Sequence, residues 1–221
     1  MPASVTSSLI GPVTLPGRHV RLEPLALEHV EGLLAAASED RSTYAWTTVP
    51  DSAGSMREYV SAALDLAARG EAVPFVTRLG DTGRVVGTTR FANFEYHAWP
   101  EGHPLRRPVG APDAVEIGWT WLAASAQRTP VNTEAKWLML RHAFETWGVR
   151  CVRLKTDRRN ERSRAAIERI GGKLDGVIRA HSPGADGTLR DSAYFSILAA
   201  EWPAVDAGLR ARLGLSTGSK A

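Results

Sequence analysis

The sequence predicts an α/β (α+β) fold in which a mixed β-sheet is covered by helices on its faces. Three observations support this. Segments that alternate apolar and polar residues at the two-residue period of a strand are interspersed with apolar stripes at helical spacing. Two pairs of strand segments flank short turns rich in Gly, Asp and Pro, a pattern typical of hairpins. The order of elements is one strand, two helices, three strands, then helix, strand, helix and two strands, so the sheet should contain about seven strands.

The first half of the chain predicts a strand, two helices and a hairpin. Residues 13–25 alternate apolar with charged positions near their end, as a half-buried strand does. Residues 27–38 and 55–69 each place apolar side chains on one helical side, and a glycine follows the second segment. Residues 75–79 and 84–91 flank a Gly-Asp-Thr-Gly turn, so they should pair as antiparallel neighbours.

The second half begins with the strand on which function is most readable. In 115–122, period-two alternation places Glu116 and Gly118 on one face. A polar turn at 127–132 then leads into a helix expected from Thr133 to Trp147. The remaining elements are expected to be a strand at 149–157, a helix at 161–170, a hairpin of 173–181 and 188–198, and a closing helix at 201–213.

Length and composition predict one domain at 13–213, between a disordered tail at 1–12 and a polar tail at 214–221. No repeat or linker divides the chain. Residues 95–113 form a long irregular segment with four prolines, which suggests an acceptor pocket or a dimer contact.

The charge pattern and the single cysteine limit the classes of function. Cys151 permits no internal disulfide and, without a nearby histidine, is a poor candidate nucleophile. The six histidines lack ligand spacing, so we expect no metal. Without a membrane-length apolar run, we expect no membrane association and a cytoplasmic protein. A basic cluster at 150–169 could meet nucleic acid or cofactor phosphates; it lacks interleaved aromatics, which makes nucleic acid the weaker interpretation.

Two helix starts have the chemistry of ligand sites. The turn at 127–132 precedes a helix N-terminus, where unpaired N–H groups and the helix dipole favour an anion. Asn160 precedes the helix at 161–170, and Ser163 falls on its apolar side. Asn160 could be an N-cap alone or could also contact a ligand, because the two roles are compatible.

Together these motifs resemble the GNAT superfamily of acyl-CoA N-acyltransferases, and within it the RimJ/RimL-type branch. The resemblance covers about 22–202. It rests on Glu-Ile-Gly-Trp at Glu116, Thr-Glu-Ala at Thr133, the segment from Asn160 to Gly171, and the hairpin ending at 191–197. It implies a GNAT fold: a mostly antiparallel central sheet with helices on both faces and a cleft between two splayed parallel strands, 114–122 and 149–157.

The resemblance implies acetyl-CoA as cosubstrate and no metal. In the family, the turn before the central helix reads Gln/Arg-x-x-Gly-x-Gly/Ala and holds the CoA pyrophosphate with backbone N–H groups. Gln127 fits, but Pro130 and Asn132 replace small residues, and proline has no N–H to donate. Arg128, Thr129 and the side chain of Asn132 could substitute. The implied CoA-binding residues are Trp121, Leu122, Gln127, Arg128, Thr129, Pro130, Val131, Asn132, Thr133, Asn160, Arg162 and Ser163.

The implied reaction is direct attack of a neutral primary amine on the thioester in a ternary complex. Glu116 is the implied general base; its alternative is a carboxylate paired to an arginine. Ser163 and, ranked below it, Tyr194 are candidate proton donors to the leaving thiolate; Tyr194 could instead lie on a solvated face. The residues implied to border the acceptor site are Tyr44, Trp46 and Trp99, each of which could equally be a partly buried side chain or a subunit contact.

The acceptor does not follow from the resemblance. A protein N-terminus, a lysine or a small-molecule amine would each satisfy the chemistry, and a homodimer is possible. The alternative is a noncatalytic module of the same fold, which senses CoA or binds a partner or RNA through the basic cluster at 150–169. Pro130 is the residue that favours this alternative.

Overall fold

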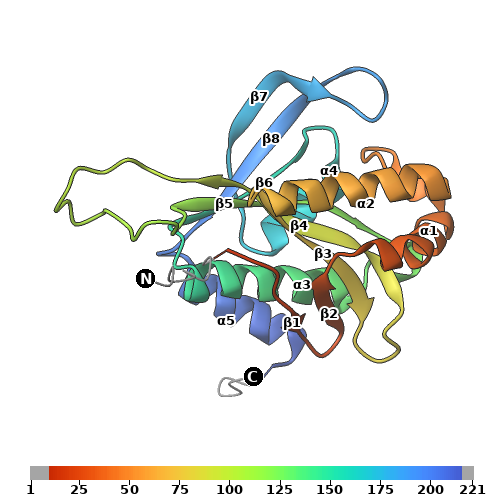
Figure 1. Cartoon of the computed structure of the whole chain (residues 1–221), viewed down its shortest axis with the longest axis horizontal. Helices are drawn as coiled ribbons and strands as arrows, with labels where there is room; N and C mark the ends of the chain where they lie inside the picture. The colour runs from red at the N-terminus through yellow and green to blue at the C-terminus, as the bar shows by residue number, and fades with distance from the viewer. Residues whose placement is uncertain (1–9, 216–221) are drawn as a thin grey trace, which may run out of the picture.

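The computed structural model describes residues 10–215 and builds one eight-stranded mixed sheet in the order β1-β2-β3-β4-β5-β6-β8-β7 (Figure 1). The predicted fold class is confirmed. The sheet has eight strands, where about seven were expected, because a tight turn divides the first expected strand into β1 (Leu15–Pro16) and β2 (Val20–Pro24). Most of the expected tails, at 1–9 and 216–221, lies outside the described residues.

The sheet is antiparallel except at one central pair. The other strands are β3 (Ala72–Leu79), β4 (Val85–Glu95), β5 (Ala114–Leu122), β6 (Cys151–Asp157), β7 (Lys173–Pro183) and β8 (Leu189–Leu198). The two predicted hairpins, β3 with β4 and β7 with β8, are confirmed. The parallel pair is β5 with β6.

Helices cover both faces of the sheet. On one face lie α1 (Val30–Ser38) and α2 (Ala53–Ala68); on the other lie α3 (Pro130–Arg141) and α5 (Trp202–Leu213), and α4 (Glu161–Arg169) follows β6 (Figure 1). Short 3-10 turns occur at Leu27–His29, Arg41–Tyr44 and Ala124–Ala126, and a π-helical turn at His142–Thr146 extends α3. Within residues 10–215, no helix has both the length and the apolar character needed to cross a bilayer.

The start of α3 differs from the sequence-based expectation. The helix begins at Pro130, three residues before the expected Thr133, so the polar turn is shorter. Thr129 is the N-cap: its hydroxyl accepts from the Val131 N–H at 3.3 Å and donates to the Ala126 carbonyl at 2.7 Å. Proline suits the first helical position because its φ is already helical and an N–H there would have no intrahelical partner. The expectation was wrong because proline suits both a turn and the first position of a helix.

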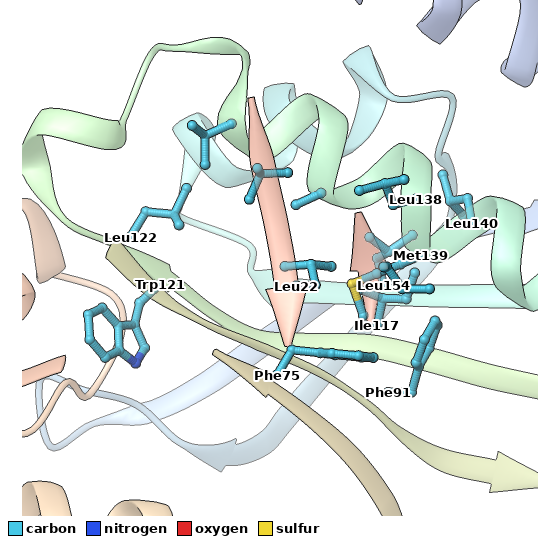
Figure 2. Packing of buried hydrophobic residues seen from close by; sticks show 14 of the residues in the cluster. Leu22, Phe75, Phe91, Ile117, Trp121, Leu122, Leu138, Met139, Leu140 and Leu154 are labelled. Atoms are coloured by element: carbon cyan, nitrogen blue, oxygen red, sulfur yellow. The ribbon is translucent and has the colours of Figure 1, made fainter. Parts of the chain in front are cut away.

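The core occupies both faces of the sheet, and one part of it lies between α3 and the sheet. Leu22, Phe75, Ile117 and Met139 gather there, whereas Trp121 points away from them (Figure 2). Phe91 packs edge-on against Phe75 with ring centroids 5.9 Å apart. This packing holds β4 and β5, which carry Asn93 and Glu116, on a rigid base.

Glu134 ties the first two strands to α3. Its buried carboxylate accepts backbone N–H groups from Arg18 at 3.0 Å, His19 at 2.6 Å and Val20 at 2.8 Å. A side chain at Gly17 would place its Cβ only 2.6 Å from the Glu134 carboxylate, so the turn requires glycine. Glu134, part of the motif at the helix start, therefore has a structural role.

Candidate active site

The central cleft forms where β5 and β6 stop pairing. Their parallel register holds only from Ala114, opposite Cys151, to Glu116, opposite Arg153; beyond it the strands diverge. In the diverging part, the register of β5 with β4 shifts and Trp119 adopts φ +50°, in the left-handed region. A bulge bends the strand that contains it. The expected cleft between splayed parallel strands is therefore present, with Glu116 at its base.

Gln127 links the two sides of this opening. Its amide nitrogen donates to the Leu122 carbonyl at 2.9 Å, and its amide oxygen accepts from Arg162 of α4 at 2.7 Å. The Leu122 carbonyl also accepts from the Tyr44 hydroxyl at 3.0 Å. Leu122, implied to pair with pantetheine, thus has its carbonyl occupied by two internal donors.

The turn before α3 has the properties of an anion site. Arg128 is exposed and adopts φ +61°, in the left-handed region, and Thr129 is exposed beside it. In an α-helix that begins at Pro130, the Asn132 N–H is one of the first-turn donors without an intrahelical acceptor. The dipole of α3 adds partial positive charge. These donors and the Arg128 guanidinium fit the pyrophosphate of CoA, although Pro130 itself offers no N–H.

Asn160 is an N-cap, as one interpretation expected. Its side-chain oxygen accepts from the Ser163 backbone N–H at 3.0 Å. Within the described part of the chain its amide NH₂ group forms no hydrogen bond, so that group is available to a ligand at the edge of the cleft. Ser163 is half-buried one turn into α4.

Glu116 is held on the cleft floor by two partners. The residue is only 4% exposed, and one carboxylate oxygen accepts from the Asn93 amide at 2.9 Å and pairs with the Lys155 ammonium at 3.0 Å. The ion pair that sequence reasoning considered is present, with lysine in place of arginine. Lys155 also lies 5.7 Å from the ring centroid of Tyr194. The structure therefore brings Glu116 and Tyr194 together around Lys155.

The Tyr194 hydroxyl is connected through His181 to the buried hydroxyl of Ser192. It lies 3.0 Å from His181 Nε2, and His181 Nδ1 lies 3.0 Å from the hydroxyl of Ser192. Ser192 is fully buried and accepts from Arg190, so its own proton is best satisfied by His181 Nδ1. This assigns the proton of the neutral imidazole to Nε2, which then donates to Tyr194. The hydroxyl proton of Tyr194 is then not used in its bond with His181.

The three aromatic residues expected at the acceptor site are not all together. The Tyr44 ring meets Trp121 at the carboxyl end of β5, with ring centroids 6.1 Å apart. Trp46 lies under the Arg159 guanidinium, at 4.5 Å, beside the end of β6. Trp99 stacks on His103 at 4.4 Å, near the start of β5. Tyr44 and Trp46 thus lie at the open end of the strands, and Trp99 at the paired end.

A buried lysine lies beneath the bulge on the α3 face. Lys136 donates to Thr120 at 2.6 Å and to Thr89 at 3.0 Å. Burial lowers the pKa of Lys136 from its usual value near 10.5 to about 7, because the apolar surroundings disfavour the charged form. By the same effect, burial raises the pKa of the Cys151 thiol, which gives no support to a nucleophilic role.

Sequence reasoning missed Asn93, Lys155, His181 and Lys136. Lys155 could have been found, because alternation along β6 places it on the side of Arg153, opposite Glu116 in the register. Asn93 adopts φ +51° near a register shift of β4, and His181 faces Tyr194 only because the β7–β8 register shifts after Ile178. No sequence pattern marks either shift.

The comparisons with known proteins agree with this geometry. The family model of the acetyltransferase (GNAT) domain matches residues 19–173. The chain belongs to the GNAT acetyltransferase family. Two solved structures support the membership of this GNAT chain over nearly its full length. A candidate acetyltransferase from T. thermophilus is 34% identical, with a TM-score of 0.72 over 91% of this chain and 97% of that one. A GCN5-related N-acetyltransferase from Brucella melitensis is 30% identical, with a TM-score of 0.72 over 90% and 84%.

More distant structures share the fold of this GNAT chain. Mycobacterium smegmatis RimJ in complex with CoA-disulfide is 23% identical, with a TM-score of 0.72 over 92% of this chain and 93% of that one. RimL, a ribosomal L7/L12 alpha-N-protein acetyltransferase, is 18% identical, with a TM-score of 0.69 over 85% and 94%. No protein of curated function has significant similarity to the sequence.

Proposed function

We propose that this GNAT domain transfers an acetyl group from acetyl-CoA to a primary amine by direct attack in a ternary complex. The observation that supports this most is the placement of Glu116. Its buried carboxylate lies on β5 where that strand leaves β6, and Asn93 and Lys155 hold it there. A carboxylate fixed at the base of the family's cleft is suited to receive a proton from an amine.

The chain offers a consistent set of residues for the cosubstrate. The Arg128 guanidinium and the backbone N–H groups of Thr129 and Asn132 would hold the pyrophosphate, and the free amide of Asn160 would bind pantetheine. Arg162 would add positive charge near the adenosine phosphate. Bound acetyl-CoA supplies the activated thioester that an amine can attack.

Glu116 and Tyr194 would handle the two protons. A lysine with a pKa near 10.4 is neutral in only about one molecule in 2,500 at pH 7, so a base is required. Glu116 accepts that proton, directly or through a water, and Lys155 positions its carboxylate. The Tyr194 hydroxyl, which receives a bond from His181, donates its proton toward the leaving sulfur.

The position of Pro130 favours the catalytic proposal over the noncatalytic alternative. The alternative depended on Pro130 as a disrupted phosphate turn. At the first position of α3, proline is compatible with a helix N-terminus that binds an anion. The acceptor can be a protein N-terminus, a lysine or a small-molecule amine.

A Glu116→Gln variant tests the proposal. With acetyl-CoA and a panel of primary amines, the wild type should release free thiol as each amine is acetylated. Glu116→Gln should lower kcat by about 10²-fold or more, because glutamine cannot accept the proton, while CoA affinity stays within about twofold. Glu95→Gln is the matched control, since Glu95 is also a strand carboxylate paired with a cation, Arg153, at 2.6 Å. Unchanged turnover of Glu116→Gln from pH 6 to 9 would contradict the role of Glu116.

A further inference from the structure

Arg90 carries a buried positive charge that has no role in the proposed reaction. It lies on β4, is 5% exposed, and has its guanidinium carbon 5.5 Å from the ring centroid of Tyr59 and 4.9 Å from that of Trp119. Across residues 10–215, no hydrogen bond or ion pair to the Arg90 guanidinium is present. Burying a charge without an anionic partner is costly, so a buried cation without one requires an explanation, and a bound anion is one.

Arg90 and Glu116 lie on one face of the sheet as diagonal neighbours. The register pairs Arg90 with Gly118 and Ala92 with Glu116. Diagonal positions on adjacent strands are roughly 7–8 Å apart, a distance that a small molecule with two functional groups can span. Arg90 does not pair with Glu116, because that carboxylate is bound to Lys155 and Asn93.

Gly118, opposite Arg90 in the register, adds no side chain to this face. A Cβ at Gly118 would lie 3.0 Å from the nearer Glu116 carboxylate oxygen, so any larger residue would crowd the carboxylate. Trp119, the next residue, is 41% exposed and covers the Arg90 guanidinium from outside. The absent side chain thus leaves the Glu116 carboxylate uncrowded on the face that it shares with Arg90.

The charges on this face favour an anionic ligand. Arg90 and Lys155 are positive and Glu116 is negative, and the Lys155–Glu116 pair leaves the Arg90 charge uncompensated. The N–H donors of a guanidinium lie in its plane, so stacking against aromatic rings leaves these donors available at its edge. The planar fork of these donors matches the two oxygens of a carboxylate.

We propose that Arg90 binds a carboxylate of the acceptor, so that the acceptor is an amine with a carboxylate close to its amino group. The inference rests on the proposed function, because Glu116 is taken as the site of amine deprotonation. Free amino acids and peptides with an acidic second residue share this chemistry.

The test uses acceptors that differ only in the carboxylate. Each amino acid is compared with its carboxamide and its decarboxylated amine, and peptides with Asp at position two with the same peptides carrying Asn. Acetyl transfer is measured for the full-length wild type, Arg90→Gln and Arg90→Lys. Arg78→Gln is the control, because Arg78 is a strand arginine paired to Glu23 at 2.8 Å. CoA affinity of each variant reports whether it has folded.

We expect the wild type to favour carboxylate-bearing acceptors by about 10- to 100-fold in kcat/KM, the usual range for a lost charge-assisted bond. Arg90→Gln should abolish that preference without changing rates for neutral amines, and Arg90→Lys should retain part of it. The preference for a carboxylate is measured separately for amino acids and for acidic peptides. The set of acceptors that shows it identifies the source of the carboxylate.

A binding measurement separates this inference from the proposed function. CoA-saturated protein is titrated with the same acceptors by calorimetry. Binding that depends on both the carboxylate and Arg90, without any acetylation, would support the inference and contradict the proposed activity. Acetylation of amines without a preference for the carboxylate would overturn the inference alone. Neither binding nor acetylation would overturn both.

Discussion

At the level of single residues, the two candidate proton donors differ in their hydrogen-bond partners. Ser163 lies in the first turn of α4, where its backbone N–H is bonded to the Asn160 cap. Tyr194 receives a hydrogen bond from His181 and lies beside Lys155, which pairs with the proposed base. A hydroxyl that accepts a bond has its own proton available, so we now rank Tyr194 above Ser163, the reverse of the ranking from sequence.

A comparison of three variants tests this ranking. Tyr194→Phe should lower kcat by about 10²-fold with unchanged CoA affinity, because only the proton donor is removed. Ser163→Ala should have a much smaller effect. His181→Ala should reduce kcat less than Tyr194→Phe and change the pH profile, as expected for a positioning residue. Stopped assays of acetyl transfer, with single-turnover controls, measure kcat for each variant. A large loss for Ser163→Ala beside an intact Tyr194→Phe would contradict the assignment.

Single residues were predictable where strand alternation alone decides their direction. Period two placed Glu116 beside Gly118, and helical spacing placed Asn160 ahead of its helix. Asn93 and His181 could not be found, because their contacts depend on irregularities in strand register. Arg90 was overlooked because its significance is the lack of a partner, which only the packed structure reveals.

At the level of elements, Lys136 joins α3 to the bulge that opens the cleft. Its ammonium bonds to Thr89 and Thr120, and these two hydroxyls also lie 2.8 Å from each other. The folded pKa of about 7 lies below the usual 10.5, so between these values the unfolded chain binds more protons. The free energy of unfolding must therefore rise with pH across this window, and the full penalty of burial applies below about pH 7.

Lys136→Met should consequently stabilise the protein at pH 7 and less so toward pH 10. The expected gain at neutral pH is on the order of a few kcal/mol, since each pKa unit corresponds to about 1.4 kcal/mol. Urea unfolding of the wild type and the variant at pH 6.5, 8 and 9.5 measures the difference in their free energies of unfolding. The pH-dependent contributions of other titratable groups cancel in this difference. Thr120→Val serves as a control for the lost hydroxyl contact. A stability difference between the two proteins that stays constant with pH would contradict the buried, easily deprotonated lysine. A wild type that is more stable than Lys136→Met at pH 6.5 would contradict it as well.

The kinds of element and their order were predictable from periodicity and turn chemistry. The predicted boundaries of elements were wrong where one residue is compatible with two local structures. Pro130 suits either a turn or the first helical position, and the Thr129 cap decides for the helix. The split of 13–25 into β1 and β2 depends on Gly17 and the distant carboxylate of Glu134, a contact that no local pattern reveals.

At the level of the whole molecule, the basic cluster at 150–169 is largely neutralised by carboxylates from other elements. Arg153 pairs with Glu95 at 2.6 Å, Arg158 with Asp191 at 3.2 Å, and Arg159 with Asp186 at 2.8 Å. Paired charges offer less to a phosphate backbone than their number suggests. This supports the CoA interpretation over the RNA-binding one, and sequence alone could not show it because the partners are distant along the chain.

Calorimetric titration of the purified protein with CoA and acetyl-CoA tests the central claim most directly. Arg128→Gly removes the guanidinium while relaxing a left-handed φ of +61°, Asn160→Ala removes the free amide, and Arg158→Gln is a control on a paired arginine. We predict micromolar binding that the first two variants weaken and the control does not. No binding at millimolar ligand would contradict the account, because the cleft between β5 and β6 would then have kept the family's shape without its cosubstrate.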